Sequence, residues 1–231
     1  RNEIYLHIKK IFNIRENNPT KGLNNFHKLI NKLNDGELNE KRVKLINAIT
    51  NECNAGYKIF KIFEKQLINY LGPDILVQKS CNLVLQKPGD GNPSEIHRDA
   101  PLNSPYEIVL WLPLVDCYKS KSMYILDIES TKDALKFLGK NKNNWDKFEK
   151  YAKNLSSNPS IKYGSALFFF TGLIHGSEIN NEKETRVSLN IRYKNLFTPS
   201  GMKNQLQFFK SLQISDLALM GAELEAEEYF E

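Results

Sequence analysis

The sequence lacks long apolar runs and contains only three cysteines. The apolar run at residues 166–170 is far too short to cross a bilayer, and no apolar segment with a cleavage site opens the chain. Cys53, Cys81 and Cys117 are odd in number, widely spaced and without a CxxC motif. This usage argues against a disulfide framework or a zinc knuckle and suits a reducing compartment. We therefore expect a cytoplasmic protein with no membrane span.

The excess of positive charge is small. Lysine and arginine total 32 against 27 acidic residues, so the formal net charge is +5. The lysines are scattered among asparagines, and few aromatic residues interleave with them as a stacking platform for bases requires. We interpret this charge as a solvated lysine surface and do not expect a nucleic-acid partner.

Residues 1–72 have the apolar spacing of amphipathic helices. Residues 34–36, Asn-Asp-Gly, form a turn signal, and a second helical stretch covers about residues 40–70. Gly56 is expected to interrupt that stretch, and Gly72-Pro73 to end it. The sequence thus predicts a helical N-terminal layer.

From residue 75 the pattern changes to short strand-like runs separated by turn residues. A polar helical insertion is expected around residues 131–154, and a helical, acidic end over residues 201–231. With no internal repeat or linker, we expect a single domain, 1–231, of the α+β class, in which helices pack on a barrel or sandwich of strands formed by residues 75–200. The expected strands are 80–86, 95–99, 106–114, 122–127, 166–170, 175–179 and 185–193.

The last of these strands has one polar and one apolar face. Alternate side chains of a strand share a face, which places together Arg186, Ser188, Asn190 and Arg192. An ordinary antiparallel strand with water on one side would show the same alternation. The apolar run before it, which ends at His175, favours a functional interpretation.

Two histidines and an aspartate form a candidate metal site. In the sequence His97-Arg98-Asp99, the first and third side chains of an extended segment lie on one side, and His175 follows much later in the chain. Two imidazoles and one carboxylate are the facial triad of non-haem iron(II), which leaves positions open for a co-substrate and O2. Arg98 is expected to point away from the metal.

Arg186 and Ser188 suggest the co-substrate. An arginine offers a permanently charged fork for a carboxylate, and the hydroxyl of Ser188 lies on the same face. A 2-oxo diacid meets both requirements, because its 2-oxo-carboxylate end can chelate the metal while its other carboxylate pairs with Arg186.

With these residues the chain resembles the 2-oxoglutarate/Fe(II)-dependent oxygenases, in the phytanoyl-CoA-dioxygenase-like group. Several segments are similar to the family of sporadic carbohydrate cluster 2-oxoglutarate/Fe(II) oxygenases. The likeness covers about residues 75–202 and is carried by CNLVLQ (81–86), SPYEIVLWLPLVDCYK (104–119), KSMYIL (121–126) and residues 175–199.

The resemblance implies a double-stranded β-helix (jelly-roll, cupin-like) core. It also implies His97, Asp99 and His175 as iron ligands and Arg186 with Ser188 as the 2-oxoglutarate clamp. The implied activity is the O2-dependent hydroxylation of a small polar molecule, of the carbohydrate type used in surface glycan biosynthesis, with decarboxylation of 2-oxoglutarate to succinate and CO2.

Five further residues are candidates for contacts to co-substrate or substrate. Each also has an ordinary structural interpretation, as a solvent-facing strand residue or a salt bridge at the barrel rim. For Tyr124, we expect its hydroxyl to complete the carboxylate site beside Arg186. We expect Arg192 to bind an anionic group of the substrate. The full set is Asn82, Gln86, Glu107, Tyr124 and Arg192.

Several alternatives stay open from sequence. The same chemistry could act on a lipid-like acyl group or an amino acid, and the chain could be a non-catalytic jelly-roll binding module. The same ligand set could also hold zinc for hydrolysis. The oligomeric state is not determined.

Overall fold

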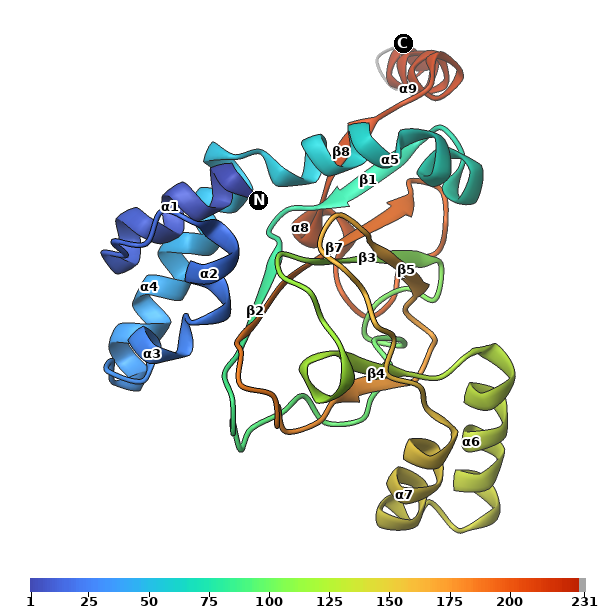
Figure 1. The fold of residues 1–231 in the computed structure, drawn as a ribbon. Helices are drawn as coiled ribbons and strands as arrows, with labels where there is room; N and C mark the ends of the chain where they lie inside the picture. The colour runs from blue at the N-terminus through green and yellow to red at the C-terminus, as the bar shows by residue number, and fades with distance from the viewer. Residues whose placement is uncertain (229–231) are drawn as a thin grey trace.

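The computed structural model describes residues 1–228. Its N-terminal part is helical, as predicted, and lies beside and above the strands in Figure 1. Asn34 caps the fourth helix through a reciprocal pair of hydrogen bonds with Glu37, which is why the turn signal there begins a helix. The elements are α1 (Asn2–Phe12), α2 (Pro19–Asn24), α3 (His27–Ile30), α4 (Asp35–Asn47), a π-helical turn (Ala48–Glu52) and α5 (Ala55–Leu71).

The predicted break at Gly56 lies slightly earlier in the structure. The helices are interrupted at Cys53 and Asn54, and Asn54 adopts a left-handed conformation with φ of 47°. Gly56 lies in the first turn of α5, where a Cβ atom would lie 3.0 Å from Cγ2 of Val77. Its role is therefore the close approach of α5 to the first strand, rather than the interruption of the helix.

The principal sheet has six strands, which pair antiparallel. The long strand β7 (Arg186–Asn195) lies at its centre and pairs with three neighbours along its length. The sheet order is β5-β3-β7-β1-β8, with β2 also on β7. The other strands are β1 (Ile75–Gln78), β2 (Asn82–Gln86), β3 (Glu107–Pro113), β5 (Leu167–Phe170) and β8 (Phe209–Gln213).

A second sheet, of β4 (Met123–Ile125) and β6 (His175–Ser177), lies opposite the first. Trp111 of β3 and Met123 of β4 belong to one buried cluster, so the two sheets face each other. Helices α6 (Ile128–Lys140) and α7 (Trp145–Leu155) form the predicted insertion and cover the outer side of the small sheet (Figure 1). The fold is α+β with a double-stranded β-helix core, as predicted.

The helical layer covers the outer face of the principal sheet. Val187, Leu189 and Ile191 of β7 share one buried cluster with Ile8 and Leu45 of the N-terminal helices. The opposite face of β7 therefore points between the two sheets. Because Arg186, Ser188 and Arg192 are buried there, the polar face of this strand does not face bulk water.

Two expectations on secondary structure are wrong. Residues 95–99 form no strand; His97 makes only an isolated bridge to His175, because the backbone around it turns after this single pairing. The end of the chain is not wholly helical either, since the short α8 (Gln205–Phe208) precedes strand β8. Strand β8 forms because β1 offers a free edge, a tertiary partner that local pattern does not reveal.

The chain ends, within its described part, in helix α9 (Asp216–Glu228), seen at the top of Figure 1; residues 229–231 of the predicted acidic end lie outside the described residues. None of the helices within residues 1–228 combines the length and apolar character needed to cross a membrane. The three cysteines are buried and free.

Candidate metal and co-substrate site

His97, Asp99 and His175 converge, although they come from distant parts of the chain. One potential ligand atom from each lies within 4.8 Å of the others. The two histidines are joined by their backbones, since each amide donates to the other's carbonyl at 2.9 Å. This bridge between the 97–99 segment and β6 brings the imidazole rings to a centroid distance of 4.3 Å. The geometry fits a two-histidine, one-carboxylate metal site.

Backbone carbonyls orient both imidazoles. Nδ1 of His97 lies 2.7 Å from the carbonyl oxygen of Glu95, and Nδ1 of His175 lies 2.9 Å from that of Leu173. A carbonyl can only accept, so Nδ1 carries the proton in each ring and Nε2 keeps its lone pair for a metal. Sequence reasoning did not identify these two carbonyls, because any backbone can supply one.

The protonation states suit metal binding. Burial, and then the neighbouring His97, lowers the pKa of His175 to about 4, so its imidazole is neutral at physiological pH. Burial alone would raise the pKa of Asp99, but the charge and hydrogen bond of Arg192 outweigh burial and lower it. The site thus presents a neutral imidazole at His175 beside an ionised carboxylate.

Arg192 lies against the candidate ligand Asp99. Its Nη2 donates to Oδ2 of Asp99 at 2.7 Å, and its Nη1 lies 3.4 Å from Oε1 of Gln78. The sequence left two interpretations of Arg192 open, a contact to an anionic group of the substrate and a salt bridge at the barrel rim. The structure shows a salt bridge. Its partner is a candidate metal ligand, which the sequence did not indicate.

A small cavity extends from the triad along the polar face of β7. Its volume is about 150 Å³, and it is lined by the triad together with Arg186, Asn190 and Arg192. Strand β2 continues this polar wall, since Asn82 pairs with Asn190, Val84 with Ser188 and Gln86 with Arg186. Asn82 and Val84 also line the cavity. The register explains why residues far apart in sequence share one wall.

Arg186 is a buried cation without a buried anion. Its side chain is 4% exposed; Nη1 donates to the carbonyl of Ser122 at 3.0 Å and Nη2 to Oγ of Ser177 at 2.8 Å, while Nε is buried without a partner. Burial lowers the pKa of Arg186 to about 10, so it is charged at neutral pH. Within residues 1–228 no carboxylate pairs with it. An uncompensated buried guanidinium favours an anionic ligand.

Three buried oxygen atoms of the wall formed by β2 and β7 also lack hydrogen-bond partners in the described part of the chain. They are Oγ of Ser188, Oδ1 of Asn190 and Oε1 of Gln86. Native proteins rarely leave such atoms unpaired, and a polar ligand is a common explanation. The residues present therefore fit a metal ion together with a small acid whose carboxylate reaches Arg186.

Gln86 and Ser188 are buried on the polar wall, but neither lines the cavity itself. Nε2 of Gln86 donates to the carbonyl of Glu178 at 2.6 Å. Several lining residues were not selected from sequence, among them Ser94, Met123, Gly176 and Ser177. Ser177 could have been found, because it lies two residues after His175 and shares its strand face.

Tyr124 and Glu107 do not lie where the sequence placed them. Tyr124 packs with Phe148 of α7 and Ile174 on the outer side of the small sheet, and its hydroxyl occupies the space that a Cβ atom of Gly176 would fill. The register places Met123, not Tyr124, toward the cavity.

Glu107 is neither exposed nor part of the cavity wall. Its carboxylate accepts from the amide of Ser104 and from Nδ2 of Asn103, each at 2.8 Å, and burial raises the pKa of this group. It holds the loop that follows Asp99. Burial and local hydrogen bonds explain both its position and that of Tyr124.

Arg98 was expected to point away from the metal, and its side chain is exposed and does not line the cavity. Trp111 is buried in the cluster between the sheets, and it also lines the cavity. Trp111 therefore belongs to the core between the sheets and also borders the site.

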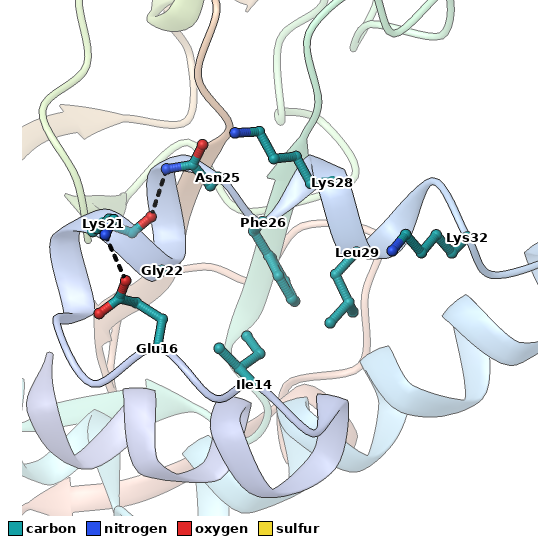
Figure 2. Close-up of a pocket in the computed structure, with 9 residues that line it drawn as sticks. All are labelled: Ile14, Glu16, Lys21, Gly22, Asn25, Phe26, Lys28, Leu29 and Lys32. Atoms are coloured by element: carbon teal, nitrogen blue, oxygen red, sulfur yellow. Dashed lines mark hydrogen bonds and ion pairs between the residues drawn. The ribbon is translucent and has the colours of Figure 1, made fainter.

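A larger hollow of about 430 Å³ lies in the N-terminal layer (Figure 2). Phe26, Leu29 and Ile14 point into it, and lysines stand at its rim. Its carboxylate, Glu16, is already paired with Lys21 at 3.2 Å. The residues that line it include none of the candidate metal ligands, so it has no part in the site.

No family model and no curated protein matches the sequence. Among solved structures, the chain is similar to a non-haem monooxygenase, the ThoJ–Ni complex, with 17% identity over 67% of this chain and 57% of that one (TM-score 0.48). It is also similar to HygX from Streptomyces hygroscopicus with nickel and 2-oxoglutarate bound, with 10% identity over 59% and 62% (TM-score 0.46). The chain spans less than two thirds of the length of these proteins.

Proposed function

We propose that the protein is an oxygenase that uses Fe(II), 2-oxoglutarate and O2. The observation that carries this proposal is the combination of the His97, Asp99 and His175 cluster with the buried, uncompensated Arg186 on the same cavity wall. A metal site alone would also suit zinc and hydrolysis. A buried guanidinium in the same cavity adds a requirement for a carboxylate, which a 2-oxo diacid satisfies.

In this proposal each residue has a defined task. His97, Asp99 and His175 hold the metal and leave positions open for the co-substrate and O2. Arg186 binds the distal carboxylate, and the hydroxyl of Ser188 donates a hydrogen bond to it. The bound pair of Fe(II) and 2-oxoglutarate would supply the oxidation, in which O2 places one oxygen atom in the substrate as hydroxyl and the other in succinate, with loss of CO2.

The substrate that we propose is a small polar molecule of the carbohydrate type, a precursor for surface glycans, hydroxylated in the cytoplasm. The family resemblance of residues 75–202 and the polar cavity wall support this class. A lipid-like acyl group fits less well, because the wall contributed by β2 and β7 presents amides and guanidinium groups.

The first test is anaerobic binding. Full-length protein with Fe(II) and 2-oxoglutarate should develop the weak visible charge-transfer band of a metal-chelated 2-oxo acid. If fully iron-loaded protein shows no band and binds no 2-oxoglutarate, the oxygenase proposal is wrong, and a binding module or a hydrolase is favoured. The second test adds O2 and candidate substrates and follows succinate release, which identifies the substrate class.

A further inference from the structure

The cavity beside the metal site is too small for both co-substrate and substrate. At about 150 Å³ it lies below the range of roughly 300–1,000 Å³ that is usual for pockets of small-molecule ligands. A groove of about 510 Å³ adjoins it. Asn82, Val84 and Ser94 line both spaces, so the groove and the cavity border the same part of the chain.

The groove follows the free edge of β2. Among the described strands, β2 pairs only with β7, and helix α4 lies against it from the N-terminal layer (Figure 1). Residues of the loop after β2, including Lys87, Asp90 and Asn92, form the other side. The helical layer thus contributes directly to a space that opens on the metal site.

One face of α4 lines this groove. Asp35, Leu38, Asn39 and Arg42 follow the spacing i, i+3, i+4 and i+7, which places their side chains along one side of a helix. Leu45 follows Arg42 on the same side of the helix and is fully buried in the core, so α4 is anchored at the end of the face whose earlier residues line the groove. The groove therefore has a rigid wall.

Lys87 comes from the loop after β2, and Arg42 is the cation that α4 contributes to the groove. Its Nε is buried without a hydrogen-bond partner, and no ion pair within residues 1–228 neutralises its charge. By contrast, Lys44 on the same helix is paired with Glu40 at 2.6 Å. A half-buried guanidinium without a partner suits a phosphate or carboxylate group, which it can bind through two parallel hydrogen bonds.

The rest of the lining offers both donors and acceptors over an apolar floor. Lys87, Asn39 and Asn92 can donate, and the carboxylates of Asp35 and Asp90 can accept from hydroxyl groups. Leu83, Leu85 and Ile30 belong to the apolar part. A molecule with several hydroxyl groups and one anionic group matches this distribution better than a purely apolar or a polyanionic one.

We infer that the groove between α4 and β2 binds the primary substrate, and that Arg42 selects a hydroxylated molecule carrying one phosphate or carboxylate group. This inference rests on the proposed oxygenase function and adds a specificity-determining residue from the helical layer. Asn82, on both the groove and the cavity, would lie where the substrate passes toward the metal.

The test compares wild type, Arg42→Gln, Arg42→Lys and the control Lys44→Gln, which removes the same charge from a side of α4 outside the groove. Titration calorimetry on full-length protein, loaded anaerobically with Fe(II) and 2-oxoglutarate, uses glucose 6-phosphate, glucuronate and neutral glucose as probes. We expect wild type and Lys44→Gln to bind one or both acids more tightly than glucose. In Arg42→Gln the affinity for the preferred acid should fall roughly tenfold or more, while the affinity for glucose stays the same. The affinity of Arg42→Lys for the acid should lie between those of wild type and Arg42→Gln.

The two acids distinguish a phosphate from a carboxylate ligand. Equal binding of the acids by Arg42→Gln and wild type would overturn the inference, and so would a wild-type protein that binds neither acid at millimolar concentration. The binding of Fe(II) and 2-oxoglutarate is measured in the same samples. If that binding fails while Arg42-dependent acid binding persists, the oxygenase function is wrong and the groove assignment stands.

Discussion

Arg192 donates a hydrogen bond from Nη2 to Oδ2 of Asp99 across 2.7 Å, and this contact engages one carboxylate oxygen only. The other oxygen, Oδ1, lies 3.7 Å from Nε2 of His97. Arg192 therefore turns one oxygen of Asp99 toward the candidate metal site and holds the other away from it. Arg192 is therefore a positioning residue, because it orients the candidate metal ligand Asp99.

Replacement of Arg192 by glutamine should weaken metal binding about 10- to 100-fold, because Asp99 loses the partner that orients it and keeps it ionised. Competition with a fluorescent chelator under anaerobic conditions measures the affinity. Arg98→Gln is the matched control, since Arg98 lies between His97 and Asp99 but its side chain is exposed. Equal affinities in the two variants would show that the ion pair has no role in metal binding.

Arg186→Met should separate co-substrate binding from metal binding. We expect the affinity for 2-oxoglutarate to fall by roughly 100-fold, since two charge-assisted hydrogen bonds are lost, while metal affinity changes less than about threefold. Without ligand the thermal midpoint should change little, because removal of a buried charge that lacks a carboxylate partner offsets the loss of its hydrogen bonds to Ser122 and Ser177. Loss of metal and co-substrate binding together, in a folded variant, would contradict the separation of the two sites.

Ser188→Ala tests the orphaned hydroxyl. Its Oγ is buried and has no hydrogen-bond partner in the described residues, so its removal should change the free energy of unfolding by less than about 1 kcal/mol. The affinity for 2-oxoglutarate should fall about tenfold, because the carboxylate loses one donor. Denaturant titration and calorimetry measure the two quantities. A strongly destabilised variant with normal 2-oxoglutarate binding would mean that the hydroxyl is structural.

Metal removal should lower thermal stability. A ligand present at 100 times its dissociation constant stabilises the folded state by about 2.7 kcal/mol. Treatment with a chelator should therefore lower the melting temperature of wild type, and Mn(II) should restore it. Asp99→Ala should melt at the same temperature with and without Mn(II). A shift of wild-type size in this variant would place the ion elsewhere.

Thiol reactivity should report on Cys117. Burial raises the pKa of Cys117 to about 11, so at pH 8 only about one thiol in a thousand is ionised. Cys53 and Cys81 are also buried, and burial raises their pKa values too. We expect none to react with iodoacetamide in the folded protein at pH 8, and all three to react in guanidinium chloride, as counted by mass spectrometry. Rapid labelling of the native chain at pH 8 would show that these thiols are accessible.

Sequence alone predicted the features that depend on local periodicity. The amphipathic pattern of residues 1–72 predicted the helical layer, and the alternation in β7 placed Arg186, Ser188, Asn190 and Arg192 on one face. The His-x-Asp spacing and the later histidine predicted a set of ligands that the structure brings together. These patterns are readable because a helix or strand repeats its faces regularly along the chain.

The tertiary structure decided what each face meets. Tyr124 and Met123 are neighbours on β4, and only the packing of α6 and α7 determines that Tyr124 is turned outward. The pairing of Arg192 with Asp99 and the strand at Phe209–Gln213 likewise depend on partners that are distant in sequence. Periodicity states which side chains lie together, whereas the side that becomes cavity, core or surface is set by the free energy of packing against the rest of the chain.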